Sequence, residues 1–443
     1  MNTEVDQAIA HYAQRLSVSR QNQDREEELT CLSQLAASYE KLFEFSQAIE
    51  YRRQVLAISQ QIGAQEWRLL ALYNLGNCYR QLSQFPESLK YFTELLQISQ
   101  QTGNRVLQIA AVWGLGTNYQ NLGKYQQAFE YFQQQLAISC EISDRSWQQS
   151  ALGSLGNVCQ FLGQYQQALI YEQKALQMAR EMKDIKAEGD SLANIGSIFI
   201  QLRQWQQAIE FCSESLTIAT NAQNKDLKMI SLNSLGLAYY GLGQYQQALN
   251  YLLAALKLSH EIGEKRVRSA ILQGLSDVYN QTNELDRAIE YNQQSLDISR
   301  EVGNRFGEAA GLSRIGSIYL QLGKHRKTLE YYKKSVDIFH QIGAKQSEQQ
   351  LLFNIGRTHY NQKRYPKAIR AFQSALTLAL ELQSQPDSAR VFLALGATFE
   401  KLNRLEDAIC HYGQAYRIHK KLGDNNQAQQ MLQTMEKLGL HHC

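Results

Sequence analysis

The sequence predicts an all-α fold, a right-handed α-solenoid (superhelix) in which antiparallel helical hairpins stack one after another. Three observations predict it. The 443 residues include only 3 prolines and are rich in Ala, Leu and Gln, so little interrupts a helix and few segments favour a strand. Apolar residues recur at the spacing of one helical face, as in Leu235 and Tyr239 and then Ala248, Leu252 and Leu256. The same two-helix pattern returns every 40 residues along nearly the whole chain.

Two markers keep this period without slippage. The first helix carries a small residue at Ala36, Gly76, Gly116, Gly156, Gly196, Gly236, Ser276, Gly316, Gly356 and Gly396. The second helix carries another at Ala8, Ala48, Ser88, Ala128, Ala168, Ala208, Ala248, Ala288, Thr328, Ala368 and Ala408. The residue before the first marker is always Leu or Ile, and a mostly aromatic residue follows it four positions later. Both of these columns are predicted to lie in the core.

In chain order, residues 1–23 match only a second helix, so the chain opens within a repeat. Ten 40-residue repeats then occupy residues 24–423. Residues 424–443 form a capping helix and tail, with Met431, Leu432, Met435 and Leu438 on the apolar side. We expect one superhelix over residues 1–443. The seventh repeat matches least well, with Ser276 for glycine and Thr282-Asn283 for Leu-Gly, and we expect looser packing there.

Turn and capping signals separate the helices. The hairpin turn usually contains Leu-Gly before a polar residue and an aromatic residue, and its glycine is suited to a positive φ at a helix end. Pro86 and Pro366 stand at the start of second helices, where a missing amide donor costs little. Between repeats, Asn104, Asp144 and Asn304 are predicted N-caps.

These columns resemble the tetratricopeptide repeat, whose first-helix Leu-Gly and aromatic residue and second-helix Ala they match over essentially the whole chain. Two features depart from that family: the usual unit is about 34 residues, and the proline near the end of its second helix is missing here. The longer unit, with Leu-Gly-Asn at residues 75–77 and 155–157, is similar to the 40-residue subclass of Pins/LGN-type polarity adaptors and bacterial repeat proteins. The resemblance implies a protein-binding scaffold.

The composition limits the expected partners and the expected cellular compartment. The net charge of +3 is too small to indicate nucleic acid or a membrane surface as the partner. The 7 cysteines are scattered and form no CxxC pair, which favours a reducing compartment over disulfides or a thiolate zinc site. The N-terminus lacks the apolar run of a signal peptide, and no stretch approaches ~18 consecutive apolar residues. We therefore expect a cytoplasmic protein without a membrane span.

No catalytic constellation has the right spacing. His260 to Glu264 resembles the start of a zinc-protease motif, but Glu replaces the second His and a glycine interrupts the helix. Two Gly-Lys pairs follow an earlier glycine by six residues where a phosphate loop has four. We interpret His441, His442 and Cys443 as a solvated end and Cys159 and Cys212 as small buried hydrophobic residues. The sequence predicts no enzyme, no cofactor and no metal.

A binding groove is the stronger prediction, since stacked hairpins leave one face of each first helix uncovered on the concave side. By the resemblance, the groove positions lie six and three residues before, and one and four after, the first-helix glycine. They give the groove candidates Tyr73, Asn77, Arg80, Trp113, Thr117, Gln120, Asn157, Gln160, Asn233, Tyr240, Gln273, Asp277, Asn280, Ser313, Ser317, Phe353, Arg357, Tyr360, Arg390 and Glu400. Amides suit an extended peptide backbone, and the aromatic members offer apolar anchors. The alternative is that these residues only solvate the inner surface.

A basic residue also opens the first helix of many repeats, at Arg105, Arg145, Lys225, Lys265, Arg305 and Lys345. A cation there opposes the helix dipole, so its recurrence requires a compensating contact. By the resemblance, Arg105, Arg145 and Arg305 would join Asn77 and Asn157 in a ligand-binding ladder. The equal alternative is a structural pair with a nearby acid, such as Arg305 with Glu308.

Three functions follow, in descending order. The first is an adaptor that binds an extended or helical segment of a partner protein in the groove. The second is a regulatory sensor whose superhelix changes pitch when a peptide or small ligand binds, hinged at the seventh repeat. The third is the binding of an acidic partner or of nucleic acid to the stretch from Arg314 to Arg370, which contains twelve Lys or Arg and three acidic residues. An apolar end face at the N-terminal half repeat would also allow a homodimer.

Overall fold

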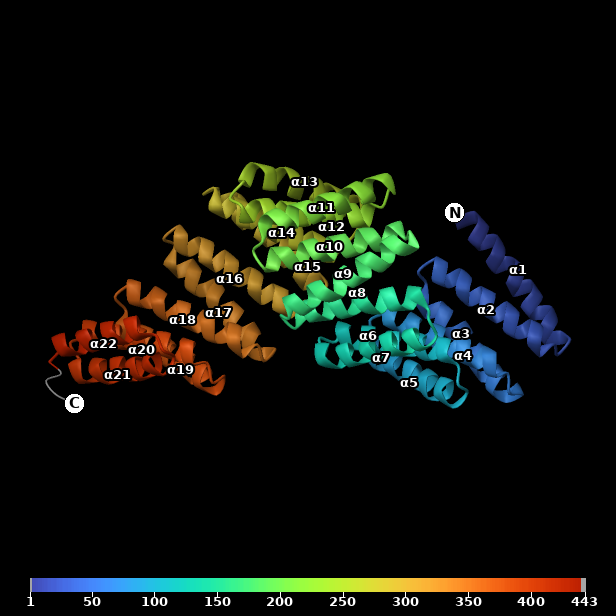
Figure 1. Ribbon diagram of the computed structural model, residues 1–443, viewed down its shortest axis with the longest axis horizontal. Helices are drawn as coiled ribbons and strands as arrows, with labels where there is room; N and C mark the ends of the chain where they lie inside the picture. Colours follow the sequence, from blue (N-terminus) through green and yellow to red (C-terminus); the bar gives the residue numbers. More distant parts are fainter. Residues whose placement is uncertain (1, 440–443) are drawn as a thin grey trace. The chain divides into compact units, whose positions relative to one another are not determined.

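The computed structural model describes residues 2–439, and within them it contains 22 helices and no strand (Figure 1). The chain divides into two compact units, residues 1–234 and 235–443, and the division falls inside α12 (Lys225–Gly241). In each unit consecutive helices form antiparallel hairpins. The predicted class, an all-α solenoid of stacked hairpins, is confirmed.

Unit 1 opens with a lone helix and continues as hairpins. Its helices before α12 are α1 (Asn2–Gln21), α2 (Arg25–Lys41), α3 (Phe45–Ile62), α4 (Gln65–Gln81), α5 (Phe85–Gln101), α6 (Arg105–Asn121), α7 (Tyr125–Glu141), α8 (Arg145–Phe161), α9 (Tyr165–Met182), α10 (Ile185–Gln201) and α11 (Trp205–Asn221). From α1 to α11 each helix packs against its neighbour in the chain, and the first helices α4, α6, α8 and α10 also contact one another in that order. We call the exposed side of these four helices the first-helix face of unit 1.

Unit 2 continues the pattern from the end of α12. Its helices are α13 (Tyr245–Ile262), α14 (Lys265–Gln281), α15 (Leu285–Glu301), α16 (Arg305–Gln321), α17 (His325–Gln341), α18 (Lys345–Asn361), α19 (Tyr365–Glu381), α20 (Gln385–Lys401), α21 (Leu405–Lys421) and α22 (Asn425–Lys437). Met431 and Met435 of α22 are buried as the sequence predicts, but Leu432 is 37% exposed because it lies on the outer side of this last helix.

The hairpin turns have one geometry throughout the repeats. In the turn between α6 and α7, Gly123 has a φ of 72°, and the amide of Lys124 donates to the carbonyl of Tyr119 over 2.9 Å. As in a Schellman motif, this hydrogen bond satisfies a backbone carbonyl that has no partner within the helix. Non-glycine residues such as Phe43 and Ser83 adopt the same left-handed φ at equivalent turns. The predicted N-caps are also present, since Asn104, Asp144 and Asn304 each accept a backbone N–H of the following turn.

The core consists of the predicted columns. Every Leu or Ile that precedes the first-helix marker is buried, and the marker glycine lies against a second-helix side chain sixteen residues later. At Gly116 an added Cβ would come 2.7 Å from the Phe132 ring. Several residues of the aromatic column stack on a second-helix tyrosine, as Tyr119 does on Tyr131 with ring centroids 5.4 Å apart.

The seventh repeat differs from its expected looseness. Its helices α14 and α15 pack together as extensively as any other pair in the described chain. The Ser276 hydroxyl donates to the carbonyl of Ala288 over 2.8 Å, and Asn292 contacts the same hydroxyl. Buried hydrogen bonds therefore replace the glycine–aromatic contact, and the expectation of loose packing is wrong within the repeat. The contact of α14 with the preceding helix α13 is, however, among the least extensive between sequential helices in the described part of the chain.

Candidate functional site

The structure places every groove candidate on a first helix. Those of unit 1 lie on α4 (Tyr73, Asn77, Arg80), α6 (Trp113, Thr117, Gln120), α8 (Asn157, Gln160) and the first part of α12 (Asn233). Those of unit 2 lie on the end of α12 (Tyr240), α14 (Gln273, Asp277, Asn280), α16 (Ser313, Ser317), α18 (Phe353, Arg357, Tyr360) and α20 (Arg390, Glu400). Except for Phe353, all of them are at least partly exposed, as a binding surface requires.

Four of the predicted residues form one cluster between α4 and α6. The Arg80 guanidinium lies 5.1 Å from the ring centroid of Trp113, and its Nη2 donates to Asn77 Oδ1 over 3.1 Å. Asn77 in turn donates to the carbonyl of Tyr73 over 3.2 Å. Burial lowers the pKa of Arg80, and its Nε has no hydrogen-bond partner among the described residues. The cluster is a preorganised cationic and aromatic surface with an unused donor.

Amide side chains continue the surface toward α8 and α10. Gln120 Nε2 on α6 donates to Asn157 Oδ1 on α8 over 3.3 Å. Beside this pair lies a cavity of about 450 Å³, which we call the amide cavity, lined by Asn157, Gln160, Phe161, Tyr165, Asn194, Ser197 and Gln201. Asn157 and Gln160 are groove candidates from the sequence, whereas the other five lining residues, three of them on α10, are not. Ser197 stands one residue after Gly196, so the 40-residue register contained the signal.

A neighbouring cavity of about 250 Å³, which the sequence pattern did not predict, contains two acidic residues. It is lined by Gln120, Gln149, Ser150, Gly153, Ser154, Asn157, Glu172, Asp190, Ser191 and Asn194, and we call it the acidic cavity. Glu172 occupies the second-helix column that holds Phe92 and Phe132 in the preceding repeats. Gly153 occupies the first-helix column that holds Tyr73 and Trp113. The loss of an aromatic residue at both columns opens the space, and both changes are visible in the register.

The candidates of unit 2 make fewer contacts with one another. Arg314 Nη1 lies 2.9 Å from both carboxylate oxygens of Asp277, and burial raises the pKa of Asp277 although Arg314 opposes the shift. Gln273 donates to the Ser295 hydroxyl over 3.2 Å, which uses it within the fold. The rings of Tyr360 and Tyr365 meet edge to face at 5.7 Å.

Phe353 differs from its expected role as an exposed anchor. It is only 8% exposed and belongs to the core with Phe372, whose ring centroid is 5.4 Å from its own. The guanidinium of Arg390 covers the outer face of the ring at 4.7 Å, and Arg390 also pairs with Asp387 at 2.8 Å. Arg390, not Phe353, is therefore the member of this pair that presents atoms to solvent.

Four of the six basic residues that open the first helices are paired with a glutamate of their own hairpin. Arg105 pairs with Glu141 at 3.0 Å, Lys345 pairs with Glu381 at 3.1 Å, and Arg145 and Lys265 pair with Glu181 and Glu301. Lys225 occupies the same place in α12. Because hairpin helices are antiparallel, each cation lies beside the negative end of the neighbouring helix, and each glutamate beside the positive end. This arrangement supplies the compensation that the sequence requires.

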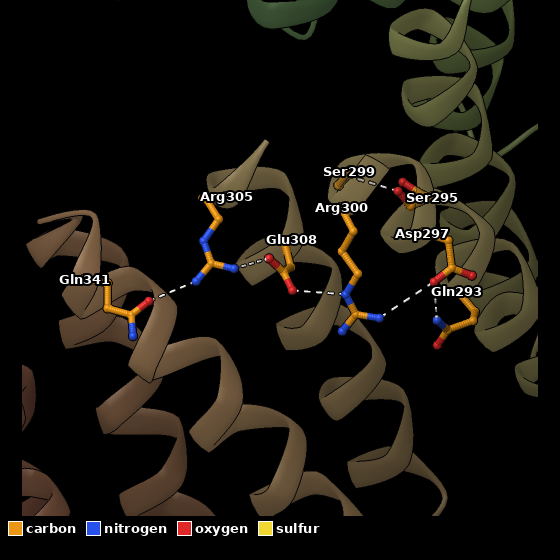
Figure 2. Close-up of polar contacts among 8 residues, drawn as sticks. All are labelled: Gln293, Ser295, Asp297, Ser299, Arg300, Arg305, Glu308 and Gln341. Atoms are coloured by element: carbon orange, nitrogen blue, oxygen red, sulfur yellow. Dashed lines mark hydrogen bonds and ion pairs between the residues drawn. The ribbon is translucent and has the colours of Figure 1, made fainter. Parts of the chain in front are cut away.

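Figure 2 shows the most extended of these contacts, around Arg305. Arg305 donates to Glu308 over 2.5 Å and to Gln341 over 2.8 Å, and Arg300 donates to the other oxygen of Glu308 over 3.0 Å. The predicted pair of Arg305 with Glu308 is thus present. The network links α15, α16 and α17, so it holds one repeat to the next; a ligand role for these cations remains a prediction.

The described residues contain no group of three or more His, Cys, Asp or Glu side chains that would hold a metal ion. None of the helices within residues 2–439 is both long and apolar enough to cross a membrane. Cys159 and Cys212 are fully buried, as predicted, and burial raises their pKa values to about 11 and about 12, so these thiols are unreactive. His441, His442 and Cys443 lie outside the described residues.

Comparison with known sequences decides the family. The sequence profile of the tetratricopeptide repeat matches residues 67–140, 108–181, 189–261, 227–301, 266–341, 307–381 and 347–421. The chain belongs to the tetratricopeptide repeat family. The resemblance that the glycine and alanine columns indicate is confirmed. No curated protein sequence matches the chain.

Several solved structures share this fold at low sequence identity. A Rap protein complexed with competence and sporulation factor is 14% identical, with 81% of this chain and 99% of that chain covered and a TM-score of 0.56. The quorum sensor NprR from B. thuringiensis, in its apo form, is 16% identical over 76% and 97%, with a TM-score of 0.54. A signal transduction ATPase from Pyrococcus horikoshii with a tetratricopeptide repeat sensor is 14% identical over 77% of this chain, with a TM-score of 0.56. This chain spans only 55% of that ATPase.

Proposed function

We propose that this tetratricopeptide repeat protein is a non-catalytic binding protein that holds an extended segment of a partner protein on the first-helix face of unit 1. The observation that carries the proposal is the cluster of Tyr73, Asn77, Arg80 and Trp113, followed by the Gln120–Asn157 pair and the amide cavity. Aromatic and arginine anchors beside partly exposed amide side chains suit an extended backbone, whose N–H and C=O groups need partners.

The structural neighbours favour the same class of function. The Rap protein is complexed with competence and sporulation factor, and NprR is a quorum sensor. Two forms of the proposal follow: an adaptor that keeps its dimensions when the segment binds, and a sensor that changes them. Small-angle scattering with and without a bound peptide separates them, because the radius of gyration falls only for the sensor.

The test of the groove uses a displayed library of random peptides and the full-length protein. We expect peptides selected on the wild type to lose at least about tenfold in affinity for the double variant Arg80→Ala and Trp113→Ala, since anchors of this kind dominate binding. The matched control is Lys90→Ala with Glu130→Ala on the second helices α5 and α7, where both side chains are exposed. Equal affinity for both double variants would overturn the groove, provided that thermal melts show both are folded.

A basic pocket on unit 2 supports a second candidate, an acidic partner. The pocket has a volume of about 580 Å³ and is lined by Arg326, Leu329, Glu330, Lys333, His359, Gln362, Arg364 and Lys367 from α17, α18 and the start of α19. Glu330 is paired with Lys334 at 2.8 Å, so the four lining cations are in excess. Burial and the nearby Lys367 lower the pKa of His359, which keeps it neutral in this positive setting.

A further inference from the structure

The acidic cavity of unit 1 is built from three first helices and one second helix. Gln120 comes from α6, Gly153 and Asn157 from α8, and Asp190 and Asn194 from α10, while Glu172 of α9 forms the floor. A Cβ at Gly153 would meet no atom within 4 Å, so the space over this residue is open. The cavity of about 250 Å³ is several times the ~30 Å³ that one water molecule occupies in the liquid. It therefore has room for the end of a side chain.

The floor residue has a hydrogen-bonding atom without a partner. Glu172 is 0% exposed, and its Oε1 accepts a hydrogen bond from Asn194 Nδ2 over 3.0 Å. Its Oε2 is buried and has no partner among the described residues. An ionised carboxylate lacks a protein donor at Oε2, and a protonated one lacks a protein acceptor for its O–H, so no described side chain or backbone group satisfies this atom in either state.

A second carboxyl group faces the same space. Asp190 lines the cavity and keeps solvent access, so it stands at the opening while Glu172 stands at the floor. Burial raises the pKa of Glu172, and the charge of Asp190 raises it further. Burial also raises the pKa of Asp190, which Lys186 opposes and Asp184 reinforces. A positive charge between the two carboxylates would offset the unfavourable free energy of ionising both groups, which their raised pKa values reflect.

On these grounds we propose that the acidic cavity binds the basic end of an arginine side chain from the segment that lies on the first-helix face. This inference rests on the function proposed above and names the chemistry of one ligand position. The guanidinium group donates to Glu172 Oε2 and to Asp190, and Gln120 and Asn157 offer amide oxygens beside it. A planar group with five donors suits acceptors that come from several helices, and guanidinium is more weakly hydrated than ammonium.

The experiment compares two neutral-backbone probes on the full-length protein. They are acetyl-Gly-Arg-Gly-amide and acetyl-Gly-citrulline-Gly-amide, which have nearly the same shape but differ in charge. Binding is followed by nuclear magnetic resonance of protein labelled with ¹⁵N at asparagine, because the side-chain amides of Asn157 and Asn194 line the cavity. We expect the arginine probe to shift these signals saturably and to bind at least about tenfold more tightly than the citrulline probe.

Two isosteric variants and one control complete the test. Glu172→Gln should weaken the arginine probe by about tenfold or more and leave the citrulline probe unchanged, and Asp190→Asn should act in the same direction. Glu130→Gln, at an exposed position of α7, should change neither probe. Equal binding of the two probes to the wild type would overturn the proposal, even if Glu172→Gln did not fold.

The outcomes also separate this inference from the proposed function. If library peptides need Arg80 and Trp113 but bind Glu172→Gln as tightly as the wild type, the groove stands and the arginine site is wrong. If no library peptide binds the wild type while the arginine probe does, the site stands without the groove.

Discussion

Glu172 shows how one residue can depart from the repeat and still fit its packing. In other repeats the residue at its column packs against the first-helix glycine, as the Phe132 ring does against Gly116. Here the glycine is Gly156, where an added Cβ would come 2.7 Å from Glu172 Cγ and from its Oε1. The carboxylate thus takes the place of an aromatic ring. Burying such a group in a site with one hydrogen bond is costly, and natural cores rarely do so without a function.

This cost predicts a pH dependence of stability. Because burial raises the pKa of Glu172 above its unfolded value, the native chain binds more protons than the unfolded chain between the two values. The free energy of unfolding therefore falls as pH rises above the unfolded pKa of about 4.3. Glu172→Gln removes this penalty. We expect the variant to unfold at a higher denaturant concentration than the wild type at about pH 7.5, with the difference vanishing toward about pH 4.

A second variant, Asp190→Asn, tests the same prediction, because Asp190 raises the pKa of Glu172 and carries a raised pKa itself. It should raise stability at neutral pH in the same sense, but less, since Asp190 keeps solvent access. A wild type that is equally or more stable than Glu172→Gln at neutral pH would contradict the interpretation of Glu172 as a destabilising group.

At the scale of helices, the glycines of the first helix serve two different purposes. Gly116 on α6 is a contact glycine, because a Cβ would come 2.7 Å from the Phe132 ring on α7. Gly153 on α8 faces the open acidic cavity and touches nothing that a Cβ would meet within 4 Å. Both glycines lie in the first helix of a repeat, so they differ only in the side chains that surround them.

This contrast predicts opposite effects of the same substitution. Gly116→Ala should destabilise the chain by about 1–3 kcal/mol, because overpacking forces the buried ring to move. Gly153→Ala should stabilise it by about 0.5–1 kcal/mol, because alanine favours the helix and meets no clash. Chemical denaturation of the two variants beside the wild type measures both. Changes of the same sign at the two positions would refute the assignment of these two roles.

Charged side-chain pairs also join the ends of neighbouring helices. Each charged pair joins the start of one helix to the end of its hairpin partner, as Arg105 does with Glu141 at 3.0 Å. Both side chains are about half exposed, so each such pair contributes at most about 1 kcal/mol. Glu308 is different, since it is nearly buried and two arginines share it (Figure 2). The pairs such as Arg105 with Glu141 therefore act within one hairpin, whereas the Glu308 network joins one repeat to the next.

On the scale of the whole molecule, charge is divided between the two units. Residues 1–234 contain 19 Lys or Arg against 23 Asp or Glu, whereas residues 235–443 contain 26 against 19. The cavities follow this division, with an acidic cavity on unit 1 and a basic pocket on unit 2. The two proposed ligand sites therefore lie in units of opposite net charge.

The basic pocket predicts a salt-dependent affinity for polyanions. We expect the full-length protein to bind a heparin column and Arg364→Glu with Lys367→Glu to elute at clearly lower salt, because fewer counterions are released on binding. The control reverses two exposed lysines outside the pocket, Lys257 and Lys401, with the same change in net charge. If both double variants elute together, net charge alone governs retention and the pocket has no role in it.

The sequence by itself determined the helices, the hairpin turns and the core columns. These features depend on contacts between near neighbours or on a register that repeats every 40 residues, so Gly123, Asn104 and the Leu column could be assigned from the letters alone. The sequence also predicted four groove residues that contact one another in the structure, namely Tyr73, Asn77, Arg80 and Trp113.

Only the tertiary structure decided which of these residues present a surface. Phe353 is covered by Arg390, and four of the six cations that open first helices pair with glutamates 36 residues further on, where the antiparallel hairpin returns. The acidic cavity needs Gln120, Gly153, Glu172 and Asp190 from four helices at once. Burial and pairing depend on side chains that are distant in sequence, and these vary from repeat to repeat while the scaffold that positions them does not.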